Sequence, residues 1–399
     1  MPIQFRRDLS ANWRSANPTL ATGEPAWETD TKLLKVGDGT TAYNFLAHVN
    51  LGSQIAIPGG RLTPFPDVPA PGLWWESAPV SLVYYVPHTS DVIVLHDGST
   101  WRPFKFTGTT ALNLAGLPAD KCFDVFAYQS NGVVVLTTTQ WQNNFIRAVN
   151  LTLSNGIMVK SGNQLHRYIG TIRTSGPGVT ISTQRQRFIY NYYNQLPSLL
   201  FGAEYTGHTY STSAPRMWNN SVAGPLLEYV TGAPGIIHYG QNIYMRYGIA
   251  SPRFAASKPI ALTLAAPAAL GATSLTLSES AGDNVYPYLY VLAPFAGSSP
   301  YITSISGNVA QLSSGIDIAA PAGASLVLAG YAPPQAFTAN HIAPNINNNS
   351  SLLTFSSGFP TDANWMGNLS GYRVFYMTQY GFSSETWYSL YNMTISLLM

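Results

Sequence analysis

The stretch KVGDGTTAYNFL, residues 35–46, contains a Gly-Asp-Gly triplet of a kind that can do chemistry. Such a loop can bind calcium, surround a phosphate, or reverse a β-hairpin. An EF-hand loop requires acids at alternating positions and a closing Glu, but after Asp38 the next acid is Asp67. A phosphate loop requires a Lys and a following helix, and neither is present. The stretch therefore predicts LLKV and AYNFL as strands joined through Gly37-Asp38-Gly39.

Other signatures of catalysis or metal binding are missing from the sequence. It has no GxxxxGK loop, HExxH motif or GxSxG elbow, and its seven histidines include no pair at metal-ligand spacing. The single cysteine, Cys122, excludes an intrachain disulfide and a Cys-based metal cluster. In KCFDVFAY it alternates as a strand residue does, which predicts a buried, inert thiol. We therefore expect no catalytic residue, no metal and no cofactor.

Paired carboxylates leave one enzymatic alternative open, because glycoside hydrolysis needs two of them beside the cleaved bond. The 18 Asp and Glu residues lie mostly in turns. Asp124 and Glu228 fall on predicted strands and would meet only through tertiary folding. A non-enzymatic protein is favoured, and a tailspike-like polysaccharide depolymerase remains an alternative.

The segment TQRQRFIYNYYNQLP places Arg185 and Arg187 just before a run of aromatic residues. Basic residues among aromatics can stack nucleic-acid bases. A strand with Phe188, Tyr190 and Tyr192 on one face explains the same pattern. The strand is the favoured interpretation, and no nucleic-acid partner is expected.

Charged residues make up only 10% of the 399, against about a quarter in typical proteins. The net charge is +2, and residues 259–372 contain no Lys or Arg, which argues against a general binder of nucleic acid or acidic membranes. The longest apolar runs are too short to span a bilayer, and the start lacks the apolar core of a signal peptide. We expect a soluble protein made in a cytoplasm, without membrane insertion.

Aromatic residues are unusually dense, with 24 Tyr and 9 Trp concentrated in stretches such as GLWWESAPVSLVYYV and GYRVFYMTQYGFSSETWYSLYN. Tyr and Trp offer rigid, amphipathic contact area, which suits protein interfaces and the apolar faces of sugars. Packing in the core and between subunits is an equally good explanation. Candidate host-surface contacts in the C-terminal stretch are Tyr376, Tyr380, Trp387 and Tyr388.

The frequent Gly and Pro residues, and the short runs between them, predict an all-β fold. The 34 Gly and 28 Pro leave little room for long helices, and between them lie short runs rich in Val, Ile, Thr, Tyr and Phe. One helix is predicted in DLSANWRSAN, with Asp8 or Ser10 as its N-cap and its end before Pro18. Hairpin turns are predicted at Asp97-Gly98, Asn131-Gly132, Asn155-Gly156 and Ser161-Gly162.

Composition and turn spacing predict three segments and an insertion. Residues 1–50 would form a compact unit, followed by a central, hairpin-rich β-domain over 51–200. Residues 201–399 would form a C-terminal antiparallel β-sandwich of jelly-roll type. Within it, the Ala- and Gly-rich residues 259–333 are predicted to be an inserted β-module.

The N-terminal segment IQFRRDLSANWRSANPTLATGEPAWETDTKLLKVGDGTTAYNFL resembles a motif at the start of many phage fibre and tropism-determinant proteins. The resemblance follows an ordered pattern over more than forty residues. It implies a small, intertwined, β-prism-like trimer at the virion-attachment end of a fibre. The motif residues here are Arg6, Arg7, Trp13, Glu28, Asp30, Gly37, Asp38 and Gly39.

A second resemblance covers residues from about 59 to 200, with motifs such as GGRLT and YYVPHTSDVIVLHDGSTWRPFKF. It is similar to a module of phage tail-fibre and minor structural proteins. The stretches HTYSTSAPRMWNN and GYRVFYMTQYGFSSETWY are similar to the β-sandwich that follows that module. Residues 259–333 depart from the pattern, and no catalytic residues come with the resemblance.

Together these observations predict a non-enzymatic phage virion protein, displayed on the particle exterior as a homotrimeric fibre or decoration of tail or head. Its N-terminus would dock to a portal, tail or capsid protein. Its C-terminal sandwich would present an uncharged, aromatic surface to host polysaccharide. A purely architectural protein without host contact remains the other alternative.

Overall fold

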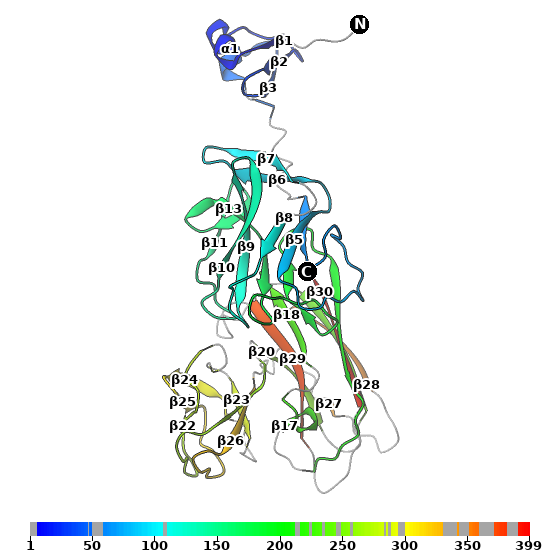
Figure 1. The fold of residues 1–399 in the computed structure, drawn as a ribbon, viewed down its shortest axis with the longest axis vertical. Helices are drawn as coiled ribbons and strands as arrows, with labels where there is room; N and C mark the ends of the chain where they lie inside the picture. Colours follow the sequence, from blue (N-terminus) through cyan, green and yellow to red (C-terminus); the bar gives the residue numbers. More distant parts are fainter. Residues whose placement is uncertain are drawn as a thin grey trace. The chain divides into compact units, whose positions relative to one another are not determined.

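The computed structural model describes residues 6–46, 48–49, 59–106, 110–211, 216–222, 226–233, 236–244, 249–255, 258–282, 285, 289–293, 300–329, 341–342, 351–358, 371–380 and 390–399. The chain divides into two compact units, Met1–Ile57 and Pro58–Met399. Strands make up most of the regular structure of the chain (Figure 1), so the all-β fold class is confirmed. Among the described residues, no helix is long and apolar enough to cross a membrane.

The first unit is a three-stranded sheet with one helix. Its elements are β1 (Arg6–Asp8), α1 (Ser10–Ala16), β2 (Pro25–Glu28), β3 (Leu34–Val36) and the 3-10 helix η1 (Tyr43–Phe45). The sheet order is β1-β2-β3, and β1 pairs with β2 in parallel because α1 supplies the crossover between them. Trp13 of α1 stacks on Tyr43 of η1, with ring centroids 5.1 Å apart, and this pair forms the core with Leu20 and Ala26.

Two local predictions for this unit are wrong. The N-cap of α1 is Leu9, which supplies no side-chain cap, and neither Asp8 nor Ser10 has that role. The AYNFL segment is not a strand, because Tyr43 turns inward in a 3-10 helix to reach Trp13. The predicted end of α1 before Pro18 is confirmed.

The second unit begins with three hairpin-rich sheets. One contains β4 (Gly60–Thr63), β5 (Leu82–Pro87) and β8 (Thr110–Asn113), and another contains β6 (Val92–His96) and β7 (Trp101–Lys105). The largest contains β9 (Cys122–Ser130), β10 (Val133–Gln140), β11 (Leu151–Ser154), β12 (Ile157–Lys160), β13 (Asn163–Arg173) and β15 (Ile189–Asn191).

All four predicted hairpins in this part are confirmed. The strands flanking each turn pair antiparallel: β6 with β7, β9 with β10, β11 with β12, and β12 with β13. At the second turn Asn131 and Gly132 have φ of 51° and 80°, the positive values that a two-residue turn needs to follow the strand twist.

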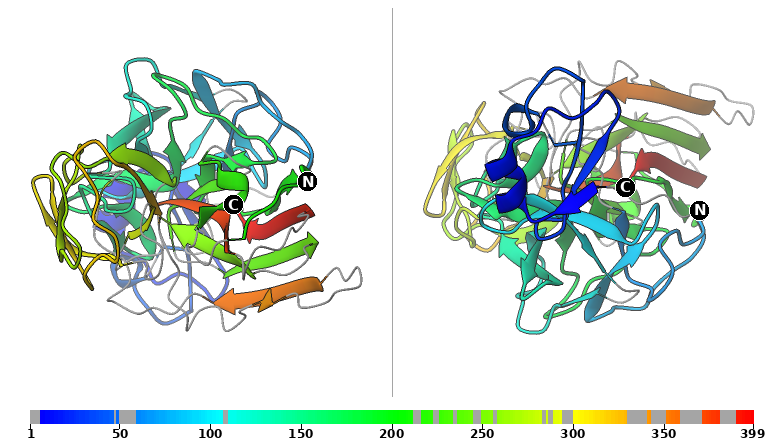
Figure 2. Two further views of the ribbon diagram at one scale, coloured as in Figure 1. Left: turned by 90° about the horizontal axis from the view of Figure 1, so that it is seen from below. Right: turned by 90° about the horizontal axis from the view of Figure 1, so that it is seen from above.

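Two further sheets share one hydrophobic core. The first has the order β14 (Gln186–Arg187), β18 (Leu227–Thr231), β29 (Gly371–Tyr380), β20 (Ile249–Ala255) and β27 (His341–Ile342), with β17 (Arg216–Met217) also on β29 and the 3-10 helix η3 (Trp218–Asn220) following β17. The second has the order β16 (Pro197–Glu204), β30 (Leu390–Leu398), β19 (Ile236–Tyr244) and β28 (Ser351–Gly358), whose strands lie side by side in Figure 2. Leu200 and Leu397 of the second sheet belong to the same core cluster as Leu227 and Val374 of the first.

Residues of the predicted insertion form two small sheets. One contains β21 (Ile260–Thr263), β26 (Ser325–Ala329) and β23 (Tyr290–Ala293), and the other contains β22 (Ser274–Thr276), β25 (Val309–Leu312) and β24 (Ile302–Ser306). Apart from Phe145, every buried member of their core cluster comes from between Leu262 and Leu328. A core of its own is what an inserted module needs. The domain boundaries at 50, 200, 259 and 333 stay predictions.

Candidate functional site

The motif residue Glu28 joins three segments of the first unit. Its carboxylate, 1% exposed, accepts hydrogen bonds from the Tyr43 hydroxyl (2.6 Å) and the Thr31 hydroxyl, and lies 3.1 Å from His48 Nε2. Burial acts to raise the pKa of Glu28, but these three interactions outweigh it and lower that pKa. Glu28 is thus an ionised internal anchor.

Asp30 caps helix α1 from a distance of twenty residues along the chain. Its carboxylate accepts hydrogen bonds from the backbone N–H of Ser10 (2.8 Å) and the Ser10 hydroxyl (2.7 Å). These bonds satisfy a free N–H group of the first turn, where a negative charge is also favoured. Both bonds lower the pKa of Asp30 to about 2.

The Gly-Asp-Gly triplet packs against residues 20–24 and does not turn a hairpin into residues 42–46. The Gly37 backbone N–H donates to the Glu24 carbonyl at 2.9 Å, and that of Gly39 donates to the Leu20 carbonyl at 3.2 Å. A Cβ on Gly37 would lie 2.3 Å from the Ala21 carbonyl oxygen, so only glycine fits.

Asp38 holds the loop that leaves this triplet. Its carboxylate accepts hydrogen bonds from the backbone N–H groups of Thr40 (2.9 Å) and Thr41 (2.7 Å) and from the Thr41 hydroxyl (2.6 Å). The hydroxyl and backbone donors lower the pKa of Asp38. Both carboxylate oxygens thus accept hydrogen bonds within a local turn of a kind common for Asp.

The remaining motif residues divide into core and surface. Trp13 is buried, with its indole N–H 3.2 Å from the Trp27 carbonyl, while Arg6 and Arg7 are exposed. Arg6 pairs with Glu24 at 2.7 Å and lies over the Trp13 ring, 5.3 Å from its centroid. Whether the exposed residues contact another virion protein stays a prediction.

The structure describes the side chain of one of the four candidate host contacts, Tyr376. Tyr376 is fully buried (0% exposed) in the core shared by the two sheets, because β29 is an inner strand of its sheet. The prediction that Tyr376 contacts a host surface is therefore wrong for this conformation. The side chain of Tyr380, and both Trp387 and Tyr388, lie outside the described residues.

The Arg- and Tyr-rich segment forms the two short strands β14 and β15, in agreement with the favoured interpretation. Phe188 and Tyr190 point into the core that the β14 and β16 sheets share (the shared sheets). Ile189 between them points into the core of the three hairpin-rich sheets that begin the second unit (the central sheets). Arg187 is buried and donates to the backbone carbonyls of Leu73 (2.8 Å) and Trp75 (3.3 Å). These side chains are therefore not available to stack bases.

The residues with catalytic potential are bound to other groups of the protein. Cys122 is buried, and burial raises the pKa of its thiol to about 12, which confirms an inert thiol. Asp124 pairs with Arg147, whereas Glu228 accepts hydrogen bonds from Gln186 and Tyr372. Within the described residues, no group of three or more His, Cys, Asp and Glu could hold a metal ion.

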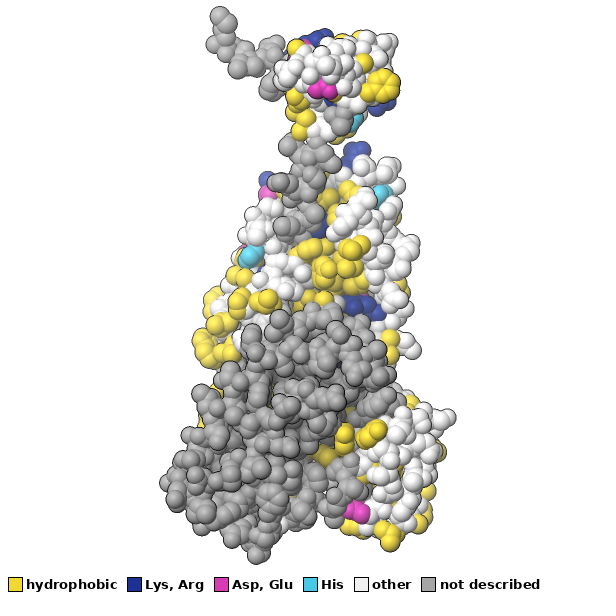
Figure 3. Space-filling view, turned by 180° about the vertical axis from the view of Figure 1, so that it is seen from behind, with side chains coloured by type: hydrophobic (Ala, Val, Ile, Leu, Met, Phe, Trp, Pro, Cys, Tyr) yellow, Lys and Arg dark blue, Asp and Glu magenta, His cyan; other side chains and the backbone are white. Residues whose placement is uncertain are grey.

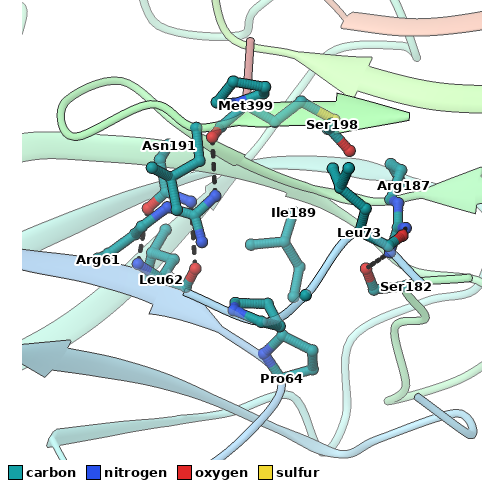
Figure 4. Close-up of a pocket in the computed structure, with 14 residues that line it drawn as sticks. Arg61, Leu62, Pro64, Leu73, Ser182, Arg187, Ile189, Asn191, Ser198 and Met399 are labelled. Carbon is teal, nitrogen blue, oxygen red and sulfur yellow. Dashed lines mark hydrogen bonds between the residues drawn. The ribbon is translucent and has the colours of Figure 1, made fainter. Parts of the chain in front are cut away.

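A small pocket between β4 and the segment 182–198 is filled by arginine contacts (Figure 4). Arg61 donates to the backbone carbonyls of Pro69 (2.9 Å), Asn194 (3.1 Å) and Met399 (2.8 Å). Burial lowers the pKa of Arg61 to about 10. At about 50 Å³ the pocket is too small for an organic ligand, and its role is structural.

A larger groove lies where the edge strands β14 and β16 of the two shared sheets approach each other. Its volume is about 890 Å³, within the range of ligand sites. No motif in the sequence predicts this groove, although Arg185 stands out as a basic residue at the start of a strand. The lining residues include Glu76, Thr183, Gln184, Arg185, Gln186, Phe201, Tyr205, Glu228 and Lys258.

Comparison with known proteins bears on the first unit. Residues 3–41 match the family model described as "Major tropism determinant N-terminal domain". The resemblance predicted for the N-terminal segment is confirmed. No curated protein matches the chain in sequence.

Solved structures of the same description also match. The "Major Tropism Determinant I1 Variant" and "P3c Variant" are each 14% identical, with 53% of this chain and 52% of those chains covered, at a TM-score of 0.23. The chain thus spans about half the length of these structures.

Proposed function

We propose that the protein is a phage virion fibre of the tropism-determinant kind, which attaches the particle to its host. The observation that carries the proposal is the match of residues 3–41 to the tropism-determinant N-terminal domain. The matched residues belong to the first unit, Met1–Ile57, which has a hydrophobic core of its own and is followed by a second unit of 342 residues. Such a unit suits a constant docking module that carries a different receptor-binding body.

In this proposal the first unit docks to a tail, portal or capsid protein, and Pro58–Met399 contacts the host on the particle exterior. The fibre is a homotrimer, because three weak sites held together gain avidity without new contacts. It acts without catalysis, by adhesion. The candidate carboxylates Asp124 and Glu228 support this, since they do not meet each other: Asp124 pairs with Arg147, and Glu228 is bound by Gln186, Lys258 and Tyr372.

The sparse charge of the surface predicts how attachment responds to salt. On the described part of the face in Figure 3, charged side chains are few and scattered among uncharged ones. Attachment through such a surface should change little between about 50 and 200 mM salt, because few ion pairs are screened.

Two assays test the proposal. The purified full-length protein should block adsorption of the phage that encodes it. Gly37→Ala, which disrupts the docking unit, should still block adsorption but should fail to enter virions when supplied in trans. A protein that enters virions but never competes for cells would instead be architectural. New reducing ends released from host polysaccharide would indicate a depolymerase.

A further inference from the structure

We propose that the groove between β14 and β16 binds a neutral saccharide of the host surface. This inference rests on the proposed function and gives the attachment a site. Three observations carry it: the way the groove is built, the polar groups that line it, and the exposed aromatic ring of Tyr205 in its lining.

The floor of the groove is fixed to both sheets. The Gln184 carbonyl accepts a hydrogen bond from the Phe201 N–H of β16, and the Arg185 carbonyl accepts one from the Glu228 N–H of β18, both at 2.8 Å. Each sheet contributes one wall, and the two backbone bonds hold the walls in register. A site on paired strands is more precisely positioned than one on a free loop.

The charges of the groove balance. Arg185 and Lys258 supply two cations, and Glu76 and Glu228 supply two carboxylates. Lys258 Nζ lies 3.0 Å from Glu228 Oε1, and the Gln186 side-chain amide donates to Glu228 Oε2 at 2.9 Å. A polyanion would meet both carboxylates, and a polycation both basic groups, so the lining favours an uncharged ligand rich in hydroxyl groups.

Several of these groups keep hydrogen-bonding capacity. Among the described residues, nothing bonds the exposed guanidinium of Arg185 or the side-chain amide of Gln184. Glu76 uses one carboxylate oxygen to accept the Gln184 backbone N–H at 2.8 Å. Donors and acceptors of both kinds therefore face one groove, which is the pattern that sugar hydroxyls require.

Two aromatic residues line the groove, and two exposed tryptophans precede Glu76 in the chain. Tyr205 lines the groove with 64% of its surface exposed, and Phe201 lies beside it on β16. Next to Glu76 in the chain, Trp74 and Trp75 are 61% and 50% exposed. Rings of this kind can pack against the apolar face of a sugar while its hydroxyls reach the polar groups.

The loop that carries Trp74 and Trp75 is held by hydrogen bonds and packing. Arg187 donates to the carbonyls of Leu73 and Trp75, and the Ser77 N–H donates to the Ser182 carbonyl at 2.8 Å. Trp75 also packs edge-on against Phe65, with ring centroids 5.6 Å apart. The loop is tied along the segment that forms the groove floor, which lowers the entropic cost of binding.

The test uses full-length protein and two probes, the neutral and the acidic polysaccharide fractions of the host envelope, separated by anion exchange. We expect binding of the neutral fraction only. Tyr205→Ala should weaken it at least tenfold, and Arg185→Ala should weaken it as well. Phe45→Ala removes an aromatic ring that is 81% exposed but lies outside the groove, and should bind as the wild type does.

Each contrary result is informative. If Tyr205→Ala and Arg185→Ala bind and block phage adsorption as well as the wild type, the groove is not the site and the proposed function stands. Preference for the acidic fraction, or loss of binding after protease treatment of cells, overturns the neutral-saccharide assignment. If the wild-type protein itself never blocks adsorption, the proposed function fails.

Discussion

Arg147 and Asp124 form a buried, two-point ion pair in the second unit. Arg147 Nε lies 2.7 Å from Asp124 Oδ2, and Nη2 lies 3.1 Å from Oδ1. The guanidinium also packs on the Trp141 ring, 4.4 Å from its centroid, and donates to the Gly232 carbonyl at 2.6 Å. One side chain thus connects β9 of the central sheets with the turn after β18 of the shared sheets.

Removing Asp124 should therefore destabilise the second unit strongly. Asp124→Ala leaves the Arg147 charge buried without its partner, which costs about 3–5 kcal/mol. Burial raises the pKa of Asp124, and the Arg147 charge opposes that rise. Each charge is therefore stabilised by the other, and removing one of them destabilises the folded protein. Urea unfolding of the full chain, followed by tryptophan fluorescence, measures the loss.

The matched control is the exposed pair of Arg102 and Asp97, whose Nε and Oδ2 atoms are also 2.7 Å apart. Arg102→Ala should cost less than about 1 kcal/mol, because solvent screens exposed pairs. Equal effects of the two substitutions would show that the Arg147 link contributes nothing special.

Asp30→Asn should remove an acid-sensitive step from the first unit. The folded pKa of Asp30, about 2, is below its ordinary value of 3.8, so its contribution is complete above that value and is lost as pH falls toward 2. In the wild type, hydrogen exchange of the peptide containing Ser10 should speed up over this pH range, after correction for intrinsic rates.

In Asp30→Asn the same peptide should exchange faster at neutral pH and show a flatter pH dependence. Asp8→Asn is the control, since among the described residues the Asp8 carboxylate accepts hydrogen bonds from the Leu9 N–H and the Asn12 side-chain amide and does not reach Ser10. If Asp30→Asn keeps the full acid response, the cap from Asp30 is not what stabilises α1.

The sequence was sufficient for the hairpins because their turns are local. Asn131-Gly132 and Asn155-Gly156 take positive φ wherever they occur between strands, so short-range chemistry decides the structure. The helix cap was missed because its donor and acceptor are twenty residues apart. Tyr43 was misassigned because its contact with Trp13 outweighed the β-propensity of its neighbours.

The candidate site was harder to predict because it depends on contacts between residues that are far apart in the sequence. Tyr376 has the alternation of a strand residue that faces solvent on one side, but the described side chains of β29, Tyr372 to Tyr376, are buried on both faces of the strand. The groove brings together Glu76, Arg185 and Glu228 from three distant segments, and no sequence pattern predicts that these residues lie close together.

Gly37→Ala should unfold or reshape the first unit. The new Cβ would lie 2.3 Å from a backbone oxygen and 2.5 Å from the Leu20 Cβ, and neither can move as a flexible side chain would. Gly23→Ala is the control: its φ is +80°, yet no atom lies within 4 Å of the added Cβ. It should cost only about 1 kcal/mol of backbone strain.

Limited proteolysis of the full chain distinguishes the two variants. We expect Gly37→Ala to be cut within residues 1–57 much faster than the wild type, and Gly23→Ala to stay close to it. Similar cleavage of both variants would mean that the close packing at Gly37 is not needed.

Arg187→Lys should loosen the loop that carries the exposed tryptophans. The planar guanidinium of Arg187 reaches the carbonyls of Leu73 and Trp75 together, whereas a single ammonium cannot keep the same fork geometry. Losing a hydrogen bond from a charged donor costs about 1.5–3 kcal/mol, equivalent to roughly tenfold or more in local opening.

Hydrogen exchange of residues 73–77 reads out this change, with Arg185→Lys as the control because Arg185 is an exposed neighbour on the same segment. Arg187→Lys should raise exchange in the loop and weaken binding of the neutral polysaccharide, while Arg185→Lys should leave exchange unchanged. If the loop opens but binding of the polysaccharide stays at the wild-type level, the tryptophans do not contribute to the groove, and Tyr205 must supply the aromatic contact alone.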